Sequence, residues 1–287
     1  MTRTTYRRWK GRLFVAIMGS ALLLCLVPLG SLLWTLVSRG GSVINFHFLT
    51  GSWAPVGEPS GIAHAIVGSL CLLGIASLLA IPLGLANGMF LARRGQTKLA
   101  GFIRLLLDVM AGIPAIVVGV FIYNTVVRHG AFSIGTGFSM LAGGLALGMI
   151  MLPIFARTAE EALRLVPSSV DEAGLALGLT QRRVILRIVL RAAVPGVVTG
   201  MFLSVARVAG EAAPLLFTAF GSNEWPQSPM KPTGSLPQLL FDYARQPFET
   251  LVRQAWGAAL VLVVLILLVR LGTHGVVRWR YGPGGDL

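Results

Sequence analysis

Long apolar runs separated by short charged segments dominate this chain. Residues 13–37 contain no charged side chain, and residues 61–92 are uncharged for 32 positions. A bilayer core of about 30 Å requires about 20 apolar residues in a helix. Further apolar runs lie at 105–127, 138–156, 192–220 and 255–269. The pattern predicts an all-α polytopic membrane protein with six transmembrane helices.

The second run is longer than one membrane crossing, since its 32 residues extend roughly 48 Å at about 1.5 Å per residue. We expect part of it to lie outside the lipid, or the helix to tilt and kink at Pro82. The first run follows a basic segment, as a signal peptide does. The hydrophobic region of a signal peptide has about 7–15 residues, and this apolar run is longer. No small-residue cleavage site follows it, so we expect a retained helix.

Composition agrees with a membrane protein. Of the 287 residues, 55% are hydrophobic and 12% are charged, whereas a soluble domain has about 25% charged residues. A soluble globular enzyme is therefore excluded. Cys25 and Cys71 both lie in apolar runs, so they predict no disulfide framework.

The placement of the 24 Lys and Arg residues explains the net charge of +13. Cytoplasmic loops of membrane proteins carry an excess of these residues. Eighteen lie in the amino-terminal segment, in 93–104, in 157–191 and at the carboxyl end, five lie on the other side, and Arg207 lies within a span. This distribution places both termini in the cytoplasm. The charge therefore reports topology, and nucleic acid is excluded as a partner.

The topology divides the chain into three parts. Residues 1–60 hold the cytoplasmic amino terminus, the first helix and a periplasmic loop. Residues 61–275 form the membrane core, which contains a cytoplasmic loop at 157–191 and a periplasmic loop at 221–254. Residues 276–287 form a cytoplasmic tail.

Motifs of enzyme catalysis are absent from the sequence. We find no Gly-rich phosphate loop ending in Lys-Ser or Lys-Thr, no His-Glu-x-x-His and no closely spaced Cys and His ligands. The four histidines are scattered through loops and span ends, which favours interfacial residues over a metal site. A membrane-bound enzyme is unsupported, and transport energy has to come from a gradient or from a partner protein.

Three charged residues fall within the predicted spans: Asp108, Arg207 and Glu211. Each costs about 2.5–3.5 kcal/mol at a helix centre. Arg207 and Glu211 are four residues apart, so on one helix face they can form an ion pair that lowers both costs. The pair either holds helices together, or Arg207 presents a cation to a passing anion while Glu211 orients its guanidinium. Asp108, in the first turn of its span, suits a helix-end role.

Glycine and proline interrupt several spans. They are Gly112 and Pro114 in the third span, Pro153 in the fourth, and Pro195, Gly196, Gly210 and Pro214 in the fifth. Such breaks free backbone carbonyls and are tolerated where protein or a water-filled cavity surrounds them. They indicate a pathway through the membrane, although small residues serve close helix packing equally well.

The segment 160–191 mixes charged residues with Ala and Gly. It is too charged to span the membrane and too hydrophobic for a freely solvated loop. Ser168 or Ser169 can cap a short helix, with Asp171-Glu172 in its first turn and Gly178 at its end. A helix with small surface residues can approach another protein closely. We interpret it as a docking element or as a plain amphipathic connector.

This segment resembles the cytoplasmic loop of the membrane permeases of bacterial ABC importers. That loop carries Glu-Ala-Ala, three residues, Gly, nine residues and Ile-x-Leu-Pro. Here Glu172-Ala173-Gly174 is followed by three residues, Gly178, nine residues and Ile188-Val189-Leu190. Gly174 replaces the second alanine, and Arg191 stands in place of the proline.

Two further segments resemble the phosphate-specific permeases of the PstA type. Residues 112–119 read Gly-Ile-Pro-Ala-Ile-Val-Val-Gly and are similar to a Gly-Ile-Pro-Ser-Ile-Val signature. Residues 207–218 read Arg-Val-Ala-Gly-Glu-Ala-Ala-Pro-Leu-Leu-Phe-Thr and are similar to an Arg-x-x-Gly-Glu-Thr-Ala-Pro-Leu-Leu signature. Together with residues 61–66, the resemblance covers residues 60–275.

The resemblance implies a type I ABC importer permease of the bacterial inner membrane. Under it, the substrate pathway would include Arg207, Glu211, Gly112 and Pro114, and ATPase coupling would involve Glu172, Ala173, Gly174 and Gly178. The implied partners are a second permease of the PstC type, two copies of a cytoplasmic ATPase of the PstB type and a periplasmic phosphate-binding protein of the PstS type.

The implied function is the translocation subunit of an ATP-driven phosphate importer. ATP would be used by the partner ATPase, and this chain would bind no cofactor of its own. An importer for another oxyanion or small solute remains an alternative, as does, less strongly, a gradient-driven transporter.

Overall fold

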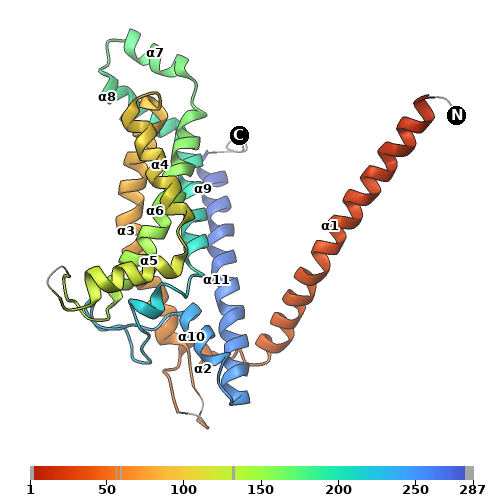
Figure 1. Ribbon diagram of the computed structural model, residues 1–287, viewed down its shortest axis with the longest axis vertical. Helices are drawn as coiled ribbons and strands as arrows, with labels where there is room; N and C mark the ends of the chain where they lie inside the picture. The colour runs from red at the N-terminus through yellow and green to blue at the C-terminus, as the bar shows by residue number, and fades with distance from the viewer. Residues whose placement is uncertain (1–2, 56, 59, 131–132, 282–287) are drawn as a thin grey trace.

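The chain folds as a helical bundle in the computed structural model, which describes residues 3–55, 57–58, 60–130 and 133–281. Among these residues no strand occurs. The α-helices are α1 (Arg3–Gly41), α2 (Phe46–Thr50), α3 (Ala63–Arg94), α4 (Lys98–Gly112), α5 (Ala115–Ile122), α6 (Met140–Arg164), α7 (Ser168–Ala176), α8 (Gln181–Val184), α9 (Leu190–Val208), α10 (Leu236–Tyr243) and α11 (Glu249–Tyr281). Figure 1 shows α7 and α8 beyond one end of the bundle, with α2 and α10 near the other.

Five stretches of helix in the described part of the chain are long and apolar enough to cross a membrane. They are Trp9–Gly41, Ala63–Arg94, Met140–Arg164, Gln181–Val208 and Glu249–Gly272. A sixth crossing is obtained if Lys98–Gly112 and Ala115–Val127 are counted as one broken span. The expected number of spans is therefore reached only with that bent pair.

The third span predicted at 105–127 is a bent pair of helices that starts earlier than predicted. Helix α4 already begins at Lys98 and ends at Gly112, and the following helix is turned by 100°. Pro114 lies at the bend, where it has no N–H for a helix and disfavours the α conformation of Ile113, which is extended. The break that Gly112 and Pro114 suggested is thus confirmed, and it is a sharp one.

The fifth span predicted at 192–220 is wrong beyond Val208. Helix α9 ends there, and the chain continues through turns and the short 3₁₀ helix Leu215–Phe217. Gly210 and Pro214 follow the helix end, and neither favours continuation of an α-helix. Arg207 therefore lies in the last turn of α9 and not in the middle of a membrane helix.

The fourth and sixth spans are longer than predicted. Helix α6 continues to Arg164 instead of ending at 156, because the charged residues of its last turns form ion pairs. Helix α11 starts at Glu249 and extends to Tyr281, through the first part of the segment expected as a tail. Residues 282–287 of that segment lie outside the described residues.

Helix α6 is the centre of the bundle and packs on α3 and α9 through small residues. A methyl group added at Gly88 of α3 would lie 2.8 Å from the Ala159 side chain of α6. One added at Gly200 of α9 would lie 2.6 Å from Thr158. These distances are shorter than real contacts allow, so the glycines permit the close approach of the helices.

Helix α1 stands apart from the other helices. In Figure 1 it leans away from the bundle and meets it near its carboxyl end. There, a methyl group at Gly40 would lie 2.6 Å from the carbonyl oxygen of Trp256 in α11. The apolar side chains along the rest of α1 are exposed, which is the surface expected of a helix surrounded by lipid.

Candidate functional site

The predicted ion pair between Arg207 and Glu211 is present. The Nη1 group of Arg207 lies 2.7 Å from Oε1 of Glu211. The two residues do not share a helix face, because α9 ends at Val208 between them. Arg207 is instead placed at a helix carboxyl end, where the helix dipole favours a cation.

The two members of this pair differ strongly in exposure. The Arg207 side chain is 66% exposed, whereas that of Glu211 is 17% exposed. Glu211 lines a small hollow with Ser69 of α3 and Leu147 of α6. Both charges come from one segment, so the pair joins no two helices, which argues against a role in holding the bundle together. Glu211 anchors the guanidinium, and the remaining donors of Arg207 point outward with no partner among the described residues.

The two segments that carry the Gly112–Pro114 and Arg207–Thr218 motifs contact each other. A methyl group at Gly119 of α5 would lie 2.7 Å from Cα of Pro214 and 2.9 Å from its carbonyl oxygen. Because these are backbone atoms, they cannot move aside as a side chain would. The bend at Pro114 thus lays α5 against the turn that follows α9.

We expect Gly119→Ala to destabilise the protein by about 1–3 kcal/mol, the usual cost of overpacking a rigid contact. Gly112→Ala is the matched control, because a methyl group there meets no described atom within 4 Å. Thermal unfolding of the detergent-solubilised protein measures both effects. Equal unfolding temperatures for the two variants would contradict the contact between α5 and Pro214.

A polar cavity of about 220 Å³ lies near α10, at the end of the bundle opposite α7. His64, Ser235 and Gln238 line it, and each has a buried polar atom without a hydrogen-bond partner in the described chain. Burial raises the pKa of Asp242 at its rim, and Arg245 lowers it by a smaller amount. No described Lys or Arg lines this cavity, so it is not built to hold an anion by charge.

The short helix predicted after Ser168 is present as α7, with one correction at its start. Pro167 is the N-cap and makes no side-chain hydrogen bond, so neither Ser168 nor Ser169 caps the helix. The end is as predicted: Gly178 has a φ of +76°, and its N–H bonds to the Leu175 carbonyl. The Leu179 N–H bonds to the Gly174 carbonyl, which completes a Schellman motif.

The residues of α7 divide into an inner and an outer set. Asp171 forms an ion pair of 2.9 Å with Arg93 at the end of α3. Gly174 is buried, and a methyl group there would lie 2.8 Å from Val184 of α8. Glu172, Ala173 and Leu177 are exposed. The inner set fixes the helix on the bundle, and the outer set is free to contact another protein.

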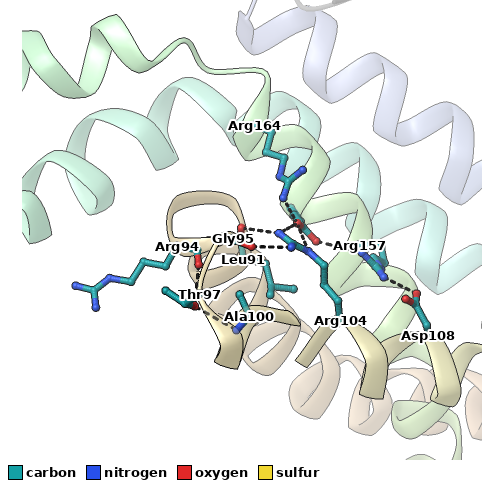
Figure 2. Close-up of polar contacts among 10 residues, drawn as sticks. Leu91, Arg94, Gly95, Thr97, Ala100, Arg104, Asp108, Arg157 and Arg164 are labelled. Atoms are coloured by element: carbon teal, nitrogen blue, oxygen red, sulfur yellow. Dashed lines mark hydrogen bonds and ion pairs between the residues drawn. The ribbon is translucent and has the colours of Figure 1, made fainter. Parts of the chain in front are cut away.

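The sequence interpretation did not single out one buried carboxylate, that of Glu160, whose partners Arg104, Arg157 and Arg164 converge in Figure 2. Glu160 of α6 is almost fully buried, and its Oε1 lies 2.8 Å from Nη2 of Arg104 and 2.7 Å from Nη2 of Arg164. Its Oε2 lies 3.5 Å from Nη1 of Arg157. We call Glu160 and these three arginines the Glu160 cluster.

The Glu160 cluster joins three helices. Arg104 of α4 also donates to the carbonyls of Gly95 and Leu91, at 2.8 and 3.2 Å, and so caps the last turn of α3. Arg157 of α6 pairs in turn with Asp108 of α4. Because α4 begins at Lys98, Asp108 lies in the second half of this helix and not in the first turn of a span, and its carboxylate pairs with Arg157.

A bundle of apolar helices long enough to cross a membrane, with α7 projecting from one end, is typical of a membrane transport subunit. The chain matches the family described as "Binding-protein-dependent transport system inner membrane component" over residues 84–279. It is 40% identical to the phosphate transport system permease protein PstA of Xylella fastidiosa strain 9a5c, over 84% of this chain and 83% of that protein. It is 36% identical to the probable PstA of Methanocaldococcus jannaschii, over 92% of each chain. The chain belongs to the PstA family of phosphate transport system permeases.

Solved structures establish the fold independently. A chain of a bacterial alginate ABC transporter, in complex with a pentasaccharide-bound periplasmic protein, superimposes with a TM-score of 0.70 over 98% of both chains at 14% identity. A chain of the MetNI methionine transporter gives a TM-score of 0.62 over 76% of this chain and 95% of that one, at 22% identity. The chain is an inner-membrane permease subunit of the ABC importer class, a transport component and not an enzyme.

Proposed function

We propose that this chain is the membrane-spanning translocation subunit of an ATP-driven phosphate importer and that Arg207 contacts the anion on its path. The observation that carries the role of Arg207 is its exposure, with Glu211 alone among the described residues bonded to it. A guanidinium binds phosphate oxygens in a bidentate manner, and the Glu211 carboxylate moderates its charge. The contact is weak, because a pathway that binds its solute tightly cannot release it.

The importer would be completed by other subunits. These are a second permease of the PstC type, two copies of a cytoplasmic ATPase of the PstB type and a phosphate-binding protein of the PstS type. ATP is used by the ATPase, and this chain binds no cofactor. The exposed residues Glu172, Ala173 and Leu177 of α7 form the contact with the ATPase, while Gly174 and Gly178 give α7 its shape.

The chain offers a direct mechanical route from the ATPase to Arg207. Helix α7 leads through α8 and the π-helical turn Ile185–Val189 into α9, and Arg207 lies in the last turn of α9. Closure of the ATPase dimer would displace α7 and, with it, the start of α9. The same helix would then move Arg207 between two positions, one open to each side of the membrane.

Uptake of radiolabelled phosphate by cells that express this chain with its partners tests the proposal. We expect uptake to stop on ATP depletion and to resist excess unlabelled sulfate. Glu172→Lys should abolish both uptake and co-purification with the ATPase, because it reverses an exposed charge on α7. Glu224→Lys is the control, since Glu224 is equally exposed but lies in the loop between α9 and α10.

Each alternative function has its own outcome in this experiment. Uptake that persists without ATP would overturn the ABC mechanism. An assembled, ATP-hydrolysing complex that takes up sulfate in place of phosphate would keep the class and overturn the substrate. Retained ATPase binding by Glu172→Lys would overturn the docking role of the outer residues of α7.

A further inference from the structure

A groove with an unusual lining lies between the end of α3 and the start of the α8–α9 segment. It has a volume of about 380 Å³. One part of its wall is apolar and the other is basic; the lining residues are Met89, Phe90, Ile185 and Leu186, and Arg93, Arg94, Gln181 and Arg182. No carboxylate among the described residues lines the groove, and Arg93 is paired with Asp171 outside it, so Arg94 and Arg182 give the groove its uncompensated positive charge.

The arginines of this groove have hydrogen-bonding capacity to spare. Arg94 and Arg182 are exposed, and the described chain gives neither side chain an ion pair or hydrogen bond. Figure 2 shows Arg94 pointing away from the Glu160 cluster. Arg93 is held by Asp171, yet its Nε and Nη2 are buried without a partner among the described residues. Buried donors of this kind normally have an acceptor, so an acceptor group that entered the groove would satisfy them.

The place of the groove on the candidate spans favours a lipid as its ligand. Its apolar wall belongs to two candidate spans, Ala63–Arg94 and Gln181–Val208, at the ends where each meets arginine. In membrane proteins, arginines at the ends of apolar helices meet phospholipid phosphates, while the neighbouring apolar side chains meet the acyl chains. A free anion would use only the arginines and leave the apolar wall exposed to water. A lipid satisfies both halves of the lining.

We propose that this groove binds an anionic phospholipid, such as phosphatidylglycerol. The lipid phosphate would lie on Arg94 and Arg182, with an acyl chain against Phe90 and Leu186. Because Arg93 lines the same groove and is bonded to Asp171 of α7, the lipid would stand next to the ion pair that fixes the docking helix. The inference rests on the lining of the groove and holds whichever solute the protein carries.

The test compares two double variants of the full-length chain in phosphatidylcholine nanodiscs that contain spin-labelled phosphatidylglycerol. Arg94→Gln with Arg182→Gln removes two charges from the groove. Arg183→Gln with Arg187→Gln removes two exposed charges of the same segment that do not line the groove. We expect the immobilised lipid fraction to fall at least about fivefold in the first and to stay near the wild-type value in the second.

Other results would overturn the proposal. An equal fall in both variants would mean general attraction to a basic surface, and no fall in either would mean no site. Displacement of the spin-labelled lipid by millimolar inorganic phosphate would assign the groove to the free anion. Loss of the immobilised lipid when the ATPase binds would assign the groove to the ATPase. Leu186→Gln, at a half-exposed position, is expected to weaken binding with every charge retained, and unchanged binding would contradict the acyl contact.

Discussion

Replacing Arg207 with alanine is expected to lower phosphate uptake about 100-fold or more while the importer still assembles. Two charge-assisted hydrogen bonds to the anion are worth about 3 kcal/mol, and about 2.7 kcal/mol corresponds to a hundredfold change in rate. The fold does not depend on Arg207, since its side chain is 66% exposed and bonded only within its own segment in the described structure. Initial uptake rates, measured beside co-purification of the partner subunits, test both statements.

Arg245→Ala is a closely matched control for Arg207→Ala. The Arg245 side chain is also 66% exposed and pairs within its own segment, with Asp242 at 3.7 Å. It does not line the hollow that contains Glu211. We expect near-normal uptake in this variant. A similar loss in both variants, or loss of assembly in Arg207→Ala, would contradict a specific contact with the anion.

Arg207→Lys separates charge from geometry. Lysine keeps the positive charge but cannot bind two phosphate oxygens in the fork arrangement of a guanidinium. We expect uptake between the rates of the wild type and the alanine variant. Uptake at the alanine level would mean that bidentate binding matters most, whereas wild-type uptake would mean that a point charge is sufficient.

Hydropathy predicted the membrane crossings well and their internal geometry poorly. A run of apolar residues shows that a segment is buried in lipid, but it does not show whether the backbone is continuous. Pro153 and Pro195 lie inside unbroken helices, whereas Pro114 and Pro214 are the N-caps of α5 and of the 3₁₀ helix Leu215–Phe217. The difference comes from tertiary contacts, such as the fit of Gly119 against Pro214, which no local pattern reports.

In the candidate sites, too, features set by neighbouring residues were predictable from the sequence, and features set by contacts with other helices were not. The docking helix was predictable, because its end depends on Gly178 and on neighbouring residues in the sequence. The pairing of Arg207 with Glu211 was also predicted, but the shared helix face on which that prediction depended is absent, because α9 ends at Val208. The unequal exposure of the two side chains was not predictable, since it depends on α3 and α6, which cover Glu211 and leave Arg207 open.

The Glu160 cluster was missed because the fourth span was taken to end at residue 156. Once α6 is known to continue to Arg164, the spacing of Arg157, Glu160 and Arg164 places all three on one helix face. Arg104 was beyond the reach of this reasoning, since it comes from α4, 56 residues away in sequence from Glu160. A correct end for the fourth span would have predicted the three members of the cluster on α6. The contribution of Arg104 depends on how α4 packs against α6.

Glu160→Ala is expected to destabilise the protein by about 3–5 kcal/mol, because removing one partner of a buried ion pair leaves the other charge uncompensated. Here one buried carboxylate serves three arginines, and its loss would leave their guanidinium groups close together. Glu160→Gln keeps a hydrogen-bond acceptor for Arg104 and should lose about half as much. The unfolding temperature of the solubilised protein, measured at low and high salt, gives the comparison.

Glu161→Ala provides the control, since it removes the same charge from the adjacent, exposed position of α6. We expect a change within about 0.5 kcal/mol for this variant. Added salt should restore part of the lost stability in Glu160→Ala by screening the repulsion among the arginines. Equal stability of the two variants would mean that Arg104 holds α3 through its bonds to the Leu91 and Gly95 carbonyls alone, so that the carboxylate of the Glu160 cluster adds no net stability.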